Sequence, residues 1–221
     1  MLLEMGNAPV VASVVSRLRD AGTPPHEFRV LLRSLGYLLA HEWTKLLPTR
    51  TAGVRTPLGE ATFLTLDVDV VVVGVLRAAL PMVDGVMDAL PSARMGLVAA
   101  KRVENETTSE GGGPSGRAFE VQVTTTRIPR ARDAAVLVVD PMLATGSTLM
   151  RVVQLVAEDA PKRVAILCAI ASRFGVERAE REARQLGLPL DVVAGAVDEE
   201  LNARGYIVPG LGDAGDRAFN T

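Results

Sequence analysis

The feature that most constrains the fold is a nearly unbroken run of β-branched residues from Val68 to Leu76. Such a run is typical of a strand covered on both faces, because a half-exposed strand would alternate apolar and polar residues. Segments with strand and helix patterns then alternate to the end of the chain. We expect strands over 94–101, 118–124, 135–140, 164–171 and 190–197, and helices over 81–90, 148–158 and 176–186. This alternation predicts the α/β class, with a parallel sheet and helices on both faces.

The segments on either side of this core have other patterns. Residues 1–50 are helical in pattern, with leucines at three- and four-residue spacing after Pro24 and a stop at Pro48. Residues 51–66 read as a hairpin or arm, and the polar stretch 103–117, with GGGPSG, as a mobile loop. Because no linker or repeat interrupts the chain, we expect one domain over 1–221, made of the helical region 1–50, the arm 51–66, the core sheet 67–197 and the tail 198–221.

Composition excludes several classes of protein. Charged residues make up 23% and the net charge is −2, with eight aromatic residues, so a nucleic-acid-binding surface is not expected. The apolar run from Val70 to Leu76 is too short to span a bilayer, and the first residues carry Glu4 and no basic region, so we expect a cytoplasmic protein without membrane contact. The single cysteine, Cys168, reads as a buried inert thiol, and His26 and His41 are too few for a histidine metal cluster.

The segment VLVVDPMLATGST, residues 136–148, carries the clearest chemistry. A buried strand ends in Asp140, and Thr145-Gly146-Ser147-Thr148 opens a helix. A helix start offers free backbone N–H groups, and Gly146 lets the backbone approach an oxygen closely, so the pattern favours a phosphate site. The alternative is that Thr145 or Ser147 only caps the helix while Asp140 ends the strand.

This segment resembles the motif with which phosphoribosyltransferases bind 5-phosphoribosyl 1-diphosphate (PRPP). Its DPMLATG letters are similar to those of uracil phosphoribosyltransferases. The tail LNARGYIVPGLGDAGDRAF, residues 201–219, resembles the uracil-binding tail of that family. Shorter similar segments are LRDAGTPPHEFR, TPLGE, LRAALPMVDG and PSARMG, so the resemblance covers nearly the whole chain. It implies a phosphoribosyltransferase-type sheet with a C-terminal base-binding hood. The implied reaction, part of pyrimidine salvage, transfers the phosphoribosyl group of PRPP to N1 of uracil, giving UMP and pyrophosphate.

Three motifs depart from the common bacterial wording. Where that form reads LRAG, GLYRD and ATGGS, this chain has LRAA at 76–79, AAKRVE at 99–104 and ATGST at 144–148. These variants look more like the archaeal branch of the family. Loss of the second glycine leaves the hydroxyls and backbone donors that hold a phosphate in place.

The resemblance also implies site residues. Arg77 and Arg102 match the arginines that bind pyrophosphate. From the residues alone, Arg77 could be an arginine that only reaches solvent from a strand end, although its place directly after a buried run favours a working cation, and Arg102 reads as a solvated loop charge. Together with Asp140 and Asp213 they form the implied catalytic set. The implied PRPP site consists of Arg77, Arg102, Asp140, Pro141, Met142, Leu143, Ala144, Thr145, Gly146, Ser147, Thr148 and Asp213. The implied uracil site consists of Ile207, Gly212, Asp213 and Ala214, in a segment that otherwise reads as a tight surface turn.

The implied cofactor is Mg²⁺, held mainly through PRPP and also by Asp213. Two other functions stay open: a catalytically silent protein that senses PRPP or nucleotides, and a phosphoribosyltransferase for another base. The family forms dimers and larger assemblies, so we expect a dimer or tetramer with the arm as a subunit contact.

Archaeal-type members respond to GTP and CTP, which implies an effector site separate from the active site. The matching region is Val30, Leu31, Leu32, Arg33 and Ser34, with Arg29 beside it. Arg29 and Arg33 are four residues apart and therefore share a helix face, where they could pair with a triphosphate. From the residues alone, they read equally as solvated charges opposite the leucine stripe.

Overall fold

The computed structural model describes residues 1–103 and 120–221, which surround a central eight-stranded sheet. Along the sheet the order is β1-β10-β9-β7-β4-β5-β6, and the short β8 also pairs with β9. The strands are β1 (Leu2–Glu4), β4 (Val70–Leu76), β5 (Arg94–Val103), β6 (Glu120–Arg127), β7 (Ala135–Val139), β8 (Met142–Leu143), β9 (Arg163–Ser172) and β10 (Leu190–Asp198). Among these strands, the pairing of β5 with β6 is antiparallel and the other pairings are parallel.

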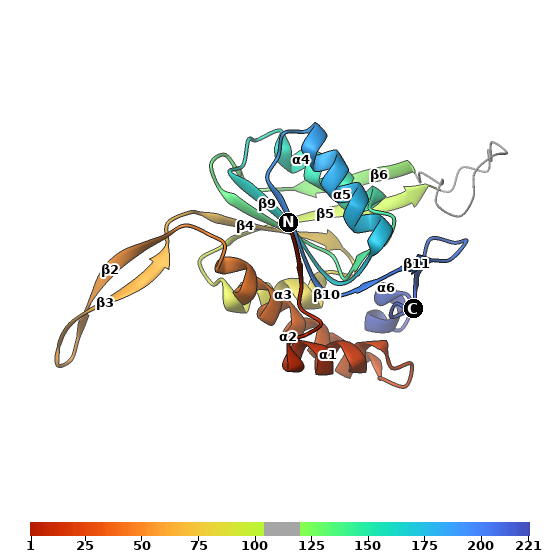
Figure 1. The fold of residues 1–221 in the computed structure, drawn as a ribbon, viewed down its shortest axis with the longest axis horizontal. Coiled ribbons are helices and arrows are strands. Elements are labelled where there is room, and N and C mark those ends of the chain that lie inside the picture. The colour runs from red at the N-terminus through yellow and green to blue at the C-terminus, as the bar shows by residue number, and fades with distance from the viewer. Residues whose placement is uncertain (104–119) are drawn as a thin grey trace.

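Helices cover both faces of the sheet (Figure 1). One layer consists of α1 (Pro9–Arg19), α2 (Pro25–Thr44) and α3 (Leu80–Ala89), and the other of α4 (Ser147–Ala157) and α5 (Arg173–Gln185). Within β4, Val70 and Val72 belong to the core cluster shared with α2 and α3, whereas Val71 and Val73 belong to the cluster shared with α4 and α5. The run is mostly β-branched because successive side chains point to opposite faces and both faces are buried.

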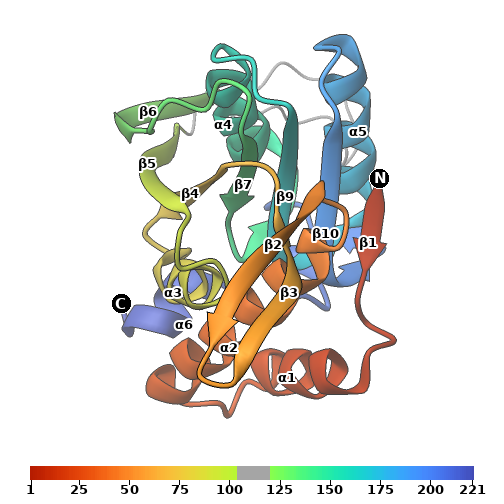
Figure 2. The ribbon, with the colours of Figure 1, turned by 90° about the vertical axis from the view of Figure 1, so that its left-hand side faces the viewer.

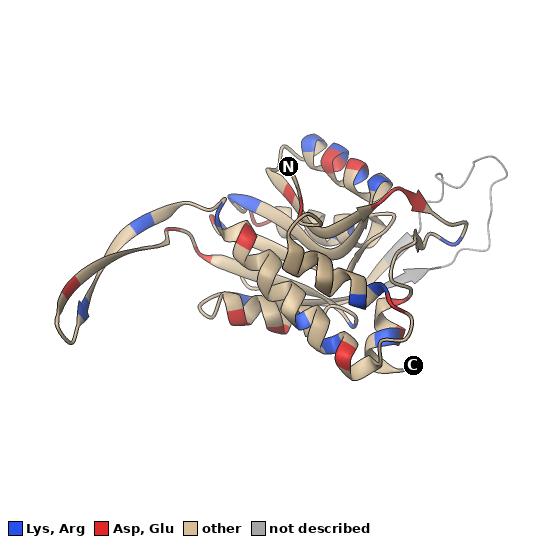
Figure 3. Cartoon of the chain, turned by 60° about the horizontal axis from the view of Figure 1, so that its bottom comes forward, with Lys and Arg blue, Asp and Glu red and all other residues tan. Residues whose placement is uncertain are grey.

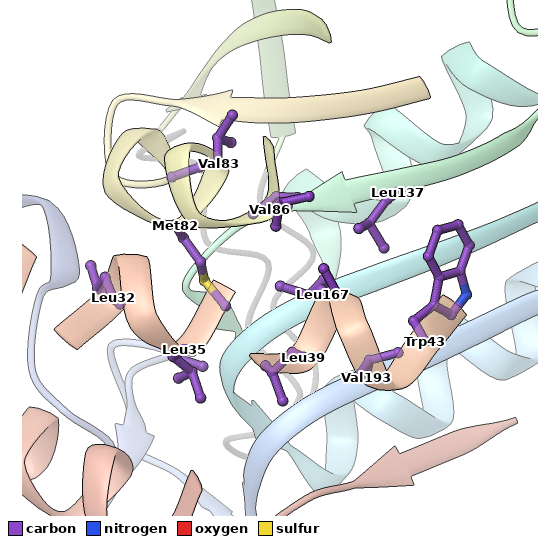
Figure 4. Packing of buried hydrophobic residues seen from close by; sticks show 14 of the residues in the cluster. Leu32, Leu35, Leu39, Trp43, Met82, Val83, Val86, Leu137, Leu167 and Val193 are labelled. Carbon is purple, nitrogen blue, oxygen red and sulfur yellow. The ribbon is translucent and has the colours of Figure 1, made fainter. Parts of the chain in front are cut away.

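The core under α2 and α3 shows how the leucine stripe is used. Leu32, Leu35 and Leu39 of α2 are fully buried, and they face α3 and the strands (Figure 4). Trp43, at the end of α2, is also fully buried, and its indole N–H lies 3.4 Å from a carboxylate oxygen of Asp191. The helical region therefore packs directly on the sheet.

The expected α/β class is confirmed, and two details are corrected. The sheet is mostly rather than wholly parallel, because β6 runs antiparallel to β5. Residues 1–50 are not all helical, since β1 pairs with β10 at the edge of the sheet. The tail contains the helix α6 (Ala214–Phe219) and a small sheet of β11 (Glu200–Leu201) and β12 (Ile207–Val208). The expected mobile loop lies outside the described residues from 104 onward.

The predicted arm is an antiparallel hairpin of β2 (Thr49–Thr56) and β3 (Gly59–Leu66). It projects away from the sheet and the helices in Figure 1, and in Figure 2, viewed from that side, it lies in front of them. Leu58 at its tip is 99% exposed and Leu64 is 73% exposed. The arm thus presents apolar side chains far from the core.

Charges of both signs are interspersed over the helices and the arm in the view of Figure 3. Within residues 1–103 and 120–221, no helix is long and apolar enough to cross a membrane. Cys168 is fully buried in β9, and burial, with a smaller effect of the negative charge of Asp140, raises the pKa of its thiol. The thiol is therefore held in its protonated, unreactive form.

Candidate active site

The candidate site lies at the end of the sheet that is formed by the carboxyl ends of its parallel strands. Val139 in β7 is paired with Gly74 in β4, so these neighbouring strands end close together. Arg77 directly follows β4, joined to Leu76 by a cis peptide bond, and Asp140 directly follows β7. Ligands of open α/β sheets bind beyond the carboxyl ends of the strands, which is where these two side chains stand.

The loop after β7 has the geometry of an anion site. Asp140 Oδ1 accepts a hydrogen bond from the Met142 amide at 3.0 Å, which fixes the first turn of the loop. Gly146 precedes α4 with φ +78°, a left-handed conformation that favours glycine, and no side chain caps this helix. Thr145 Oγ1 and Ser147 Oγ lie 3.2 Å apart. Since neither hydroxyl caps α4, its first-turn amides remain as donors for an anion.

The N-terminal turn of α5 packs against this loop from behind. Ser172 Oγ donates to the Ala144 carbonyl at 2.6 Å and accepts from the Gly175 amide at 2.8 Å. A Cβ at Gly175 would lie 2.4 Å from the Ala144 carbonyl oxygen, so only glycine fits there without a shift. Arg178 also reaches the loop, donating to Ser147 Oγ at 2.8 Å. Sequence reasoning missed Arg178, because on the expected helix it reads as a solvated charge.

The tail reaches the same end of the sheet. The Arg77 guanidinium donates to Thr221 Oγ1 at 3.1 Å and lies over the Phe219 ring, 5.5 Å from its centroid. Asp213 stands at the start of α6, where its Oδ1 accepts from the Asp216 amide at 3.0 Å. The structure therefore brings Arg77 together with the tail in which the uracil residues were predicted.

The four predicted uracil residues differ in burial. Ile207 and Ala214 are buried in the core cluster beneath the tail, whereas Gly212 and Asp213 are exposed. Buried Ile207 and Ala214 side chains shape the segment from below. This arrangement fits recognition of a base through backbone groups.

Ion pairs and carbonyl contacts anchor the tail to the helical region. Asp198, at the end of β10, accepts two hydrogen bonds from Arg19, at 2.6 and 2.7 Å, and one from the Gly210 amide at 2.9 Å. Arg217 donates to the carbonyls of Leu18, Asp20 and Leu211, and burial lowers its pKa. None of these anchors was predicted, although Asp198, like Asp140, is an acid at the end of an expected strand.

Arg102 and the predicted effector region 29–34 lie on other elements, β5 and α2. Arg102 lies in β5 with its backbone opposite Val121, and its side chain lies outside what the structure describes.

In the predicted effector region, Leu31 and Leu32 are buried core residues, while Val30, Arg33 and Ser34 are exposed. Arg29 donates to the Ala218 carbonyl at 2.7 Å, and Arg33 Nε donates to Asp88 at 2.8 Å. Hydrogen bonding to Asp88 raises the pKa of Arg33.

A divalent cation would find few protein ligands here. In the described part of the chain, no group of three or more His, Cys, Asp or Glu side chains could hold a metal ion. Asp213 and Asp140 nevertheless provide carboxylate oxygens near the strand ends, the ligand type that Mg²⁺ prefers. Such a donor set fits Mg²⁺ that arrives with a diphosphate and keeps most of its other ligands from phosphate and water.

Two neighbouring strands of the mostly parallel sheet position these groups. Asp140, the left-handed Gly146 and the start of α4 follow β7, and Arg77 follows β4. This arrangement is that of the phosphoribosyltransferase class. The profile described as uracil phosphoribosyltransferase matches residues 5–221. The chain belongs to the uracil phosphoribosyltransferase family.

Individual relatives agree with this assignment. The uracil phosphoribosyltransferase of Metallosphaera sedula is 39% identical over 215 residues, and that of Dictyoglomus thermophilum is 40% identical, each match covering 96% of both chains. Among solved structures, the AQ2163 protein from Aquifex aeolicus matches with a TM-score of 0.87 and 32% identity, covering 99% of this chain and 98% of that one. The similarity therefore extends over the helical region, the arm, the core and the tail.

Proposed function

We propose that this chain transfers the phosphoribosyl group of PRPP to N1 of uracil, giving UMP and pyrophosphate. The observation that carries the proposal is that three features meet at the carboxyl ends of the strands. They are Arg77, the loop 140–148, and the tail segment in which Asp213 caps α6. Family membership over residues 5–221 supports the choice of uracil as the base.

Each feature has a distinct role in the proposed reaction. The amides and hydroxyls of residues 145–148 hold the 5′-phosphate of PRPP, and Asp140 binds hydroxyls of the ribose. Backbone groups around Gly212 and Asp213 pair with the carbonyls and imide N–H of uracil. A base with a different donor pattern leaves a polar group unpaired, which is costly in a closed site.

Charge stabilisation drives the chemical step. As N1 of uracil bonds to the anomeric carbon, N1 releases its proton, the bond from that carbon to pyrophosphate breaks, and the bonding electron pair leaves with the pyrophosphate as negative charge. Arg77 and Arg102 supply positive charge where it develops, and no nucleophilic side chain is needed. Mg²⁺, bound through PRPP and Asp213, would neutralise part of the diphosphate charge.

One assay tests the function. The purified chain is incubated with radiolabelled uracil, PRPP and MgCl₂, and the products are identified by chromatography beside parallel reactions with cytosine, hypoxanthine and adenine. We expect UMP from uracil and no nucleotide from the other bases. A product from another base alone would indicate a different phosphoribosyltransferase. Binding of PRPP with no product from any base would indicate a sensor protein.

We further propose regulation by GTP and CTP through the region 29–34. The contact of Arg29 with the Ala218 carbonyl supports this proposal, because it joins that region directly to the tail of the proposed uracil site. Initial rates with and without GTP, in the wild type and in an Arg29→Ala/Arg33→Ala variant, test it. A wild-type rate and substrate affinities unchanged by saturating GTP would contradict it. The dimeric or tetrameric state and the cytoplasmic location stay predictions.

A further inference from the structure

Arg178 is the one α5 side chain whose charge reaches the loop of the proposed phosphate site through a described hydrogen bond. Its Nη1 donates to Ser147 Oγ at 2.8 Å and to the Thr145 carbonyl at 3.1 Å. Its Nε donates to Glu182, one helical turn further on, at 2.6 Å. The side chain is 21% exposed, so it is held between the loop and the helix rather than solvated.

These bonds set the direction of the polar groups of the loop. The Ala144 carbonyl accepts from Ser172, the N-cap of α5, and the Thr145 carbonyl accepts from Arg178 within α5, so two consecutive carbonyls are engaged from this side. Carbonyl oxygens that faced a phosphate would repel it. Drawing them toward α5 leaves the following amides for the anion.

The Arg178 guanidinium also restricts the direction in which the Ser147 hydroxyl can donate its proton. Ser147 Oγ accepts from Arg178 and therefore keeps its own proton to donate elsewhere. Its neighbour at 3.2 Å is Thr145 Oγ1, so the two hydroxyls and the guanidinium form one short chain. A positive charge at one end of such a chain strengthens the donors at the other.

We propose that Arg178 is a positioning residue for the 5′-phosphate of PRPP. It turns the Thr145 carbonyl away from the phosphate and fixes the paired Ser147 and Thr145 hydroxyls as donors toward it, while its charge adds to the attraction for the anion. The proposal rests on the proposed function, because it takes the loop 140–148 as the place of that phosphate. Glu182 fixes the guanidinium from the other side and is part of the same arrangement.

Two fragments of PRPP serve as probes that distinguish this role from a general structural role. Ribose 5-phosphate carries the 5′-phosphate without the diphosphate, and pyrophosphate carries the diphosphate without the sugar. In Arg178→Met we expect affinity for ribose 5-phosphate to fall about tenfold, the size expected for loss of one charge-assisted hydrogen bond, with pyrophosphate affinity unchanged. The PRPP KM should rise and the uracil KM should not.

Matched variants complete the experiment. Arg181→Gln removes an exposed arginine of the same helix and should leave both affinities unchanged. Arg178→Lys keeps the charge without the planar fork and should recover part of the ribose 5-phosphate affinity. If Arg178→Met does not fold, the lysine variant decides, with an intermediate and probe-specific loss expected.

The results distinguish the two proposals. A wild-type chain that forms no UMP and binds neither probe would contradict the proposed function itself. A wild-type chain that forms UMP, with an Arg178→Met variant that binds ribose 5-phosphate normally or loses both probes equally, would overturn the role of Arg178 alone.

Discussion

Arg77 carries an exposed positive charge at the end of β4. Its two described contacts, the Thr221 hydroxyl and the Phe219 ring, are with uncharged groups. Neither contact cancels the charge of the guanidinium, which is thus well suited to an anionic ligand, and both hold the side chain toward the tail. This differs from Arg33, whose charge is paired with Asp88.

Replacing Arg77 tests whether its positive charge binds the pyrophosphate group of PRPP. Arg77→Ala should lower kcat/KM for PRPP by roughly 30- to 900-fold, since one such charge contact is worth about 2–4 kcal/mol in the transition state. Steady-state kinetics and pyrophosphate inhibition measure the effect. The control is Arg184→Ala in the last turn of α5, which removes another exposed arginine and should leave turnover unchanged. Near-native kinetics in Arg77→Ala would refute the role.

Cys168 gives a prediction about pH. Because burial raises its pKa in the folded protein, the thiol stays protonated there at a pH where the unfolded chain, with a pKa of about 8.5, ionises. Ionisation then favours the unfolded state, so this thiol costs stability as the pH rises above about 8.5. A thiol reagent should label Cys168 only after denaturation, and the free energy of unfolding of the wild type should fall relative to Cys168→Ala between pH 7.5 and 9.5. Rapid labelling of the folded protein would contradict this.

At the scale of elements, the site depends on how closely α5 approaches the loop that leads into α4. Gly175 lets the first turn of α5 touch the carbonyls of Leu143 and Ala144, and Ser172 ties that turn to the loop. The tail is held in a comparable way, by Asp198 and Arg19. Both site segments are therefore loops fixed by neighbouring helices, which limits their motion and preorganises their polar groups.

The close approach at Gly175 can be tested with a single methyl group. In Gly175→Ala the new Cβ would lie 2.4 Å from one backbone oxygen and 2.7 Å from another, so the loop must shift. We expect a loss of about 1–3 kcal/mol in the free energy of unfolding together with a raised PRPP KM. Gly53→Ala in the arm, where a Cβ meets nothing within 4 Å, is the control and should change neither quantity. A Gly175→Ala variant with native stability and KM would show that the packing is looser than described.

At the scale of the whole molecule, the sequence predicts elements that have long, regular patterns and misses those fixed by distant contacts. The run that forms β4 and the leucines of α2 are readable because burial on two faces or on one stripe imposes a period. β1 is too short to show a period, and its pairing with β10 joins residues 190 positions apart, such as Leu2 and Val192. The roles of Arg178 and Arg217 were unreadable for a similar reason, because each depends on backbone carbonyls that the fold brings near.

The arm leads to the last prediction, about assembly. A two-stranded hairpin is marginally stable alone, and this one extends from the body with Val54, Leu58, Phe63 and Leu64 exposed. Apolar side chains gathered on such a projection are typical of a protein interface, and a second copy of the chain is the partner we expect. A Leu58→Lys/Leu64→Lys variant should shift the mass measured by light scattering from that of an oligomer toward the 23.4 kDa of one chain. Val10→Lys, which charges an exposed apolar residue of α1 instead, is the control and should leave the assembly intact. A wild-type monomer, or an oligomer that survives the double substitution, would show that the arm is not the subunit contact.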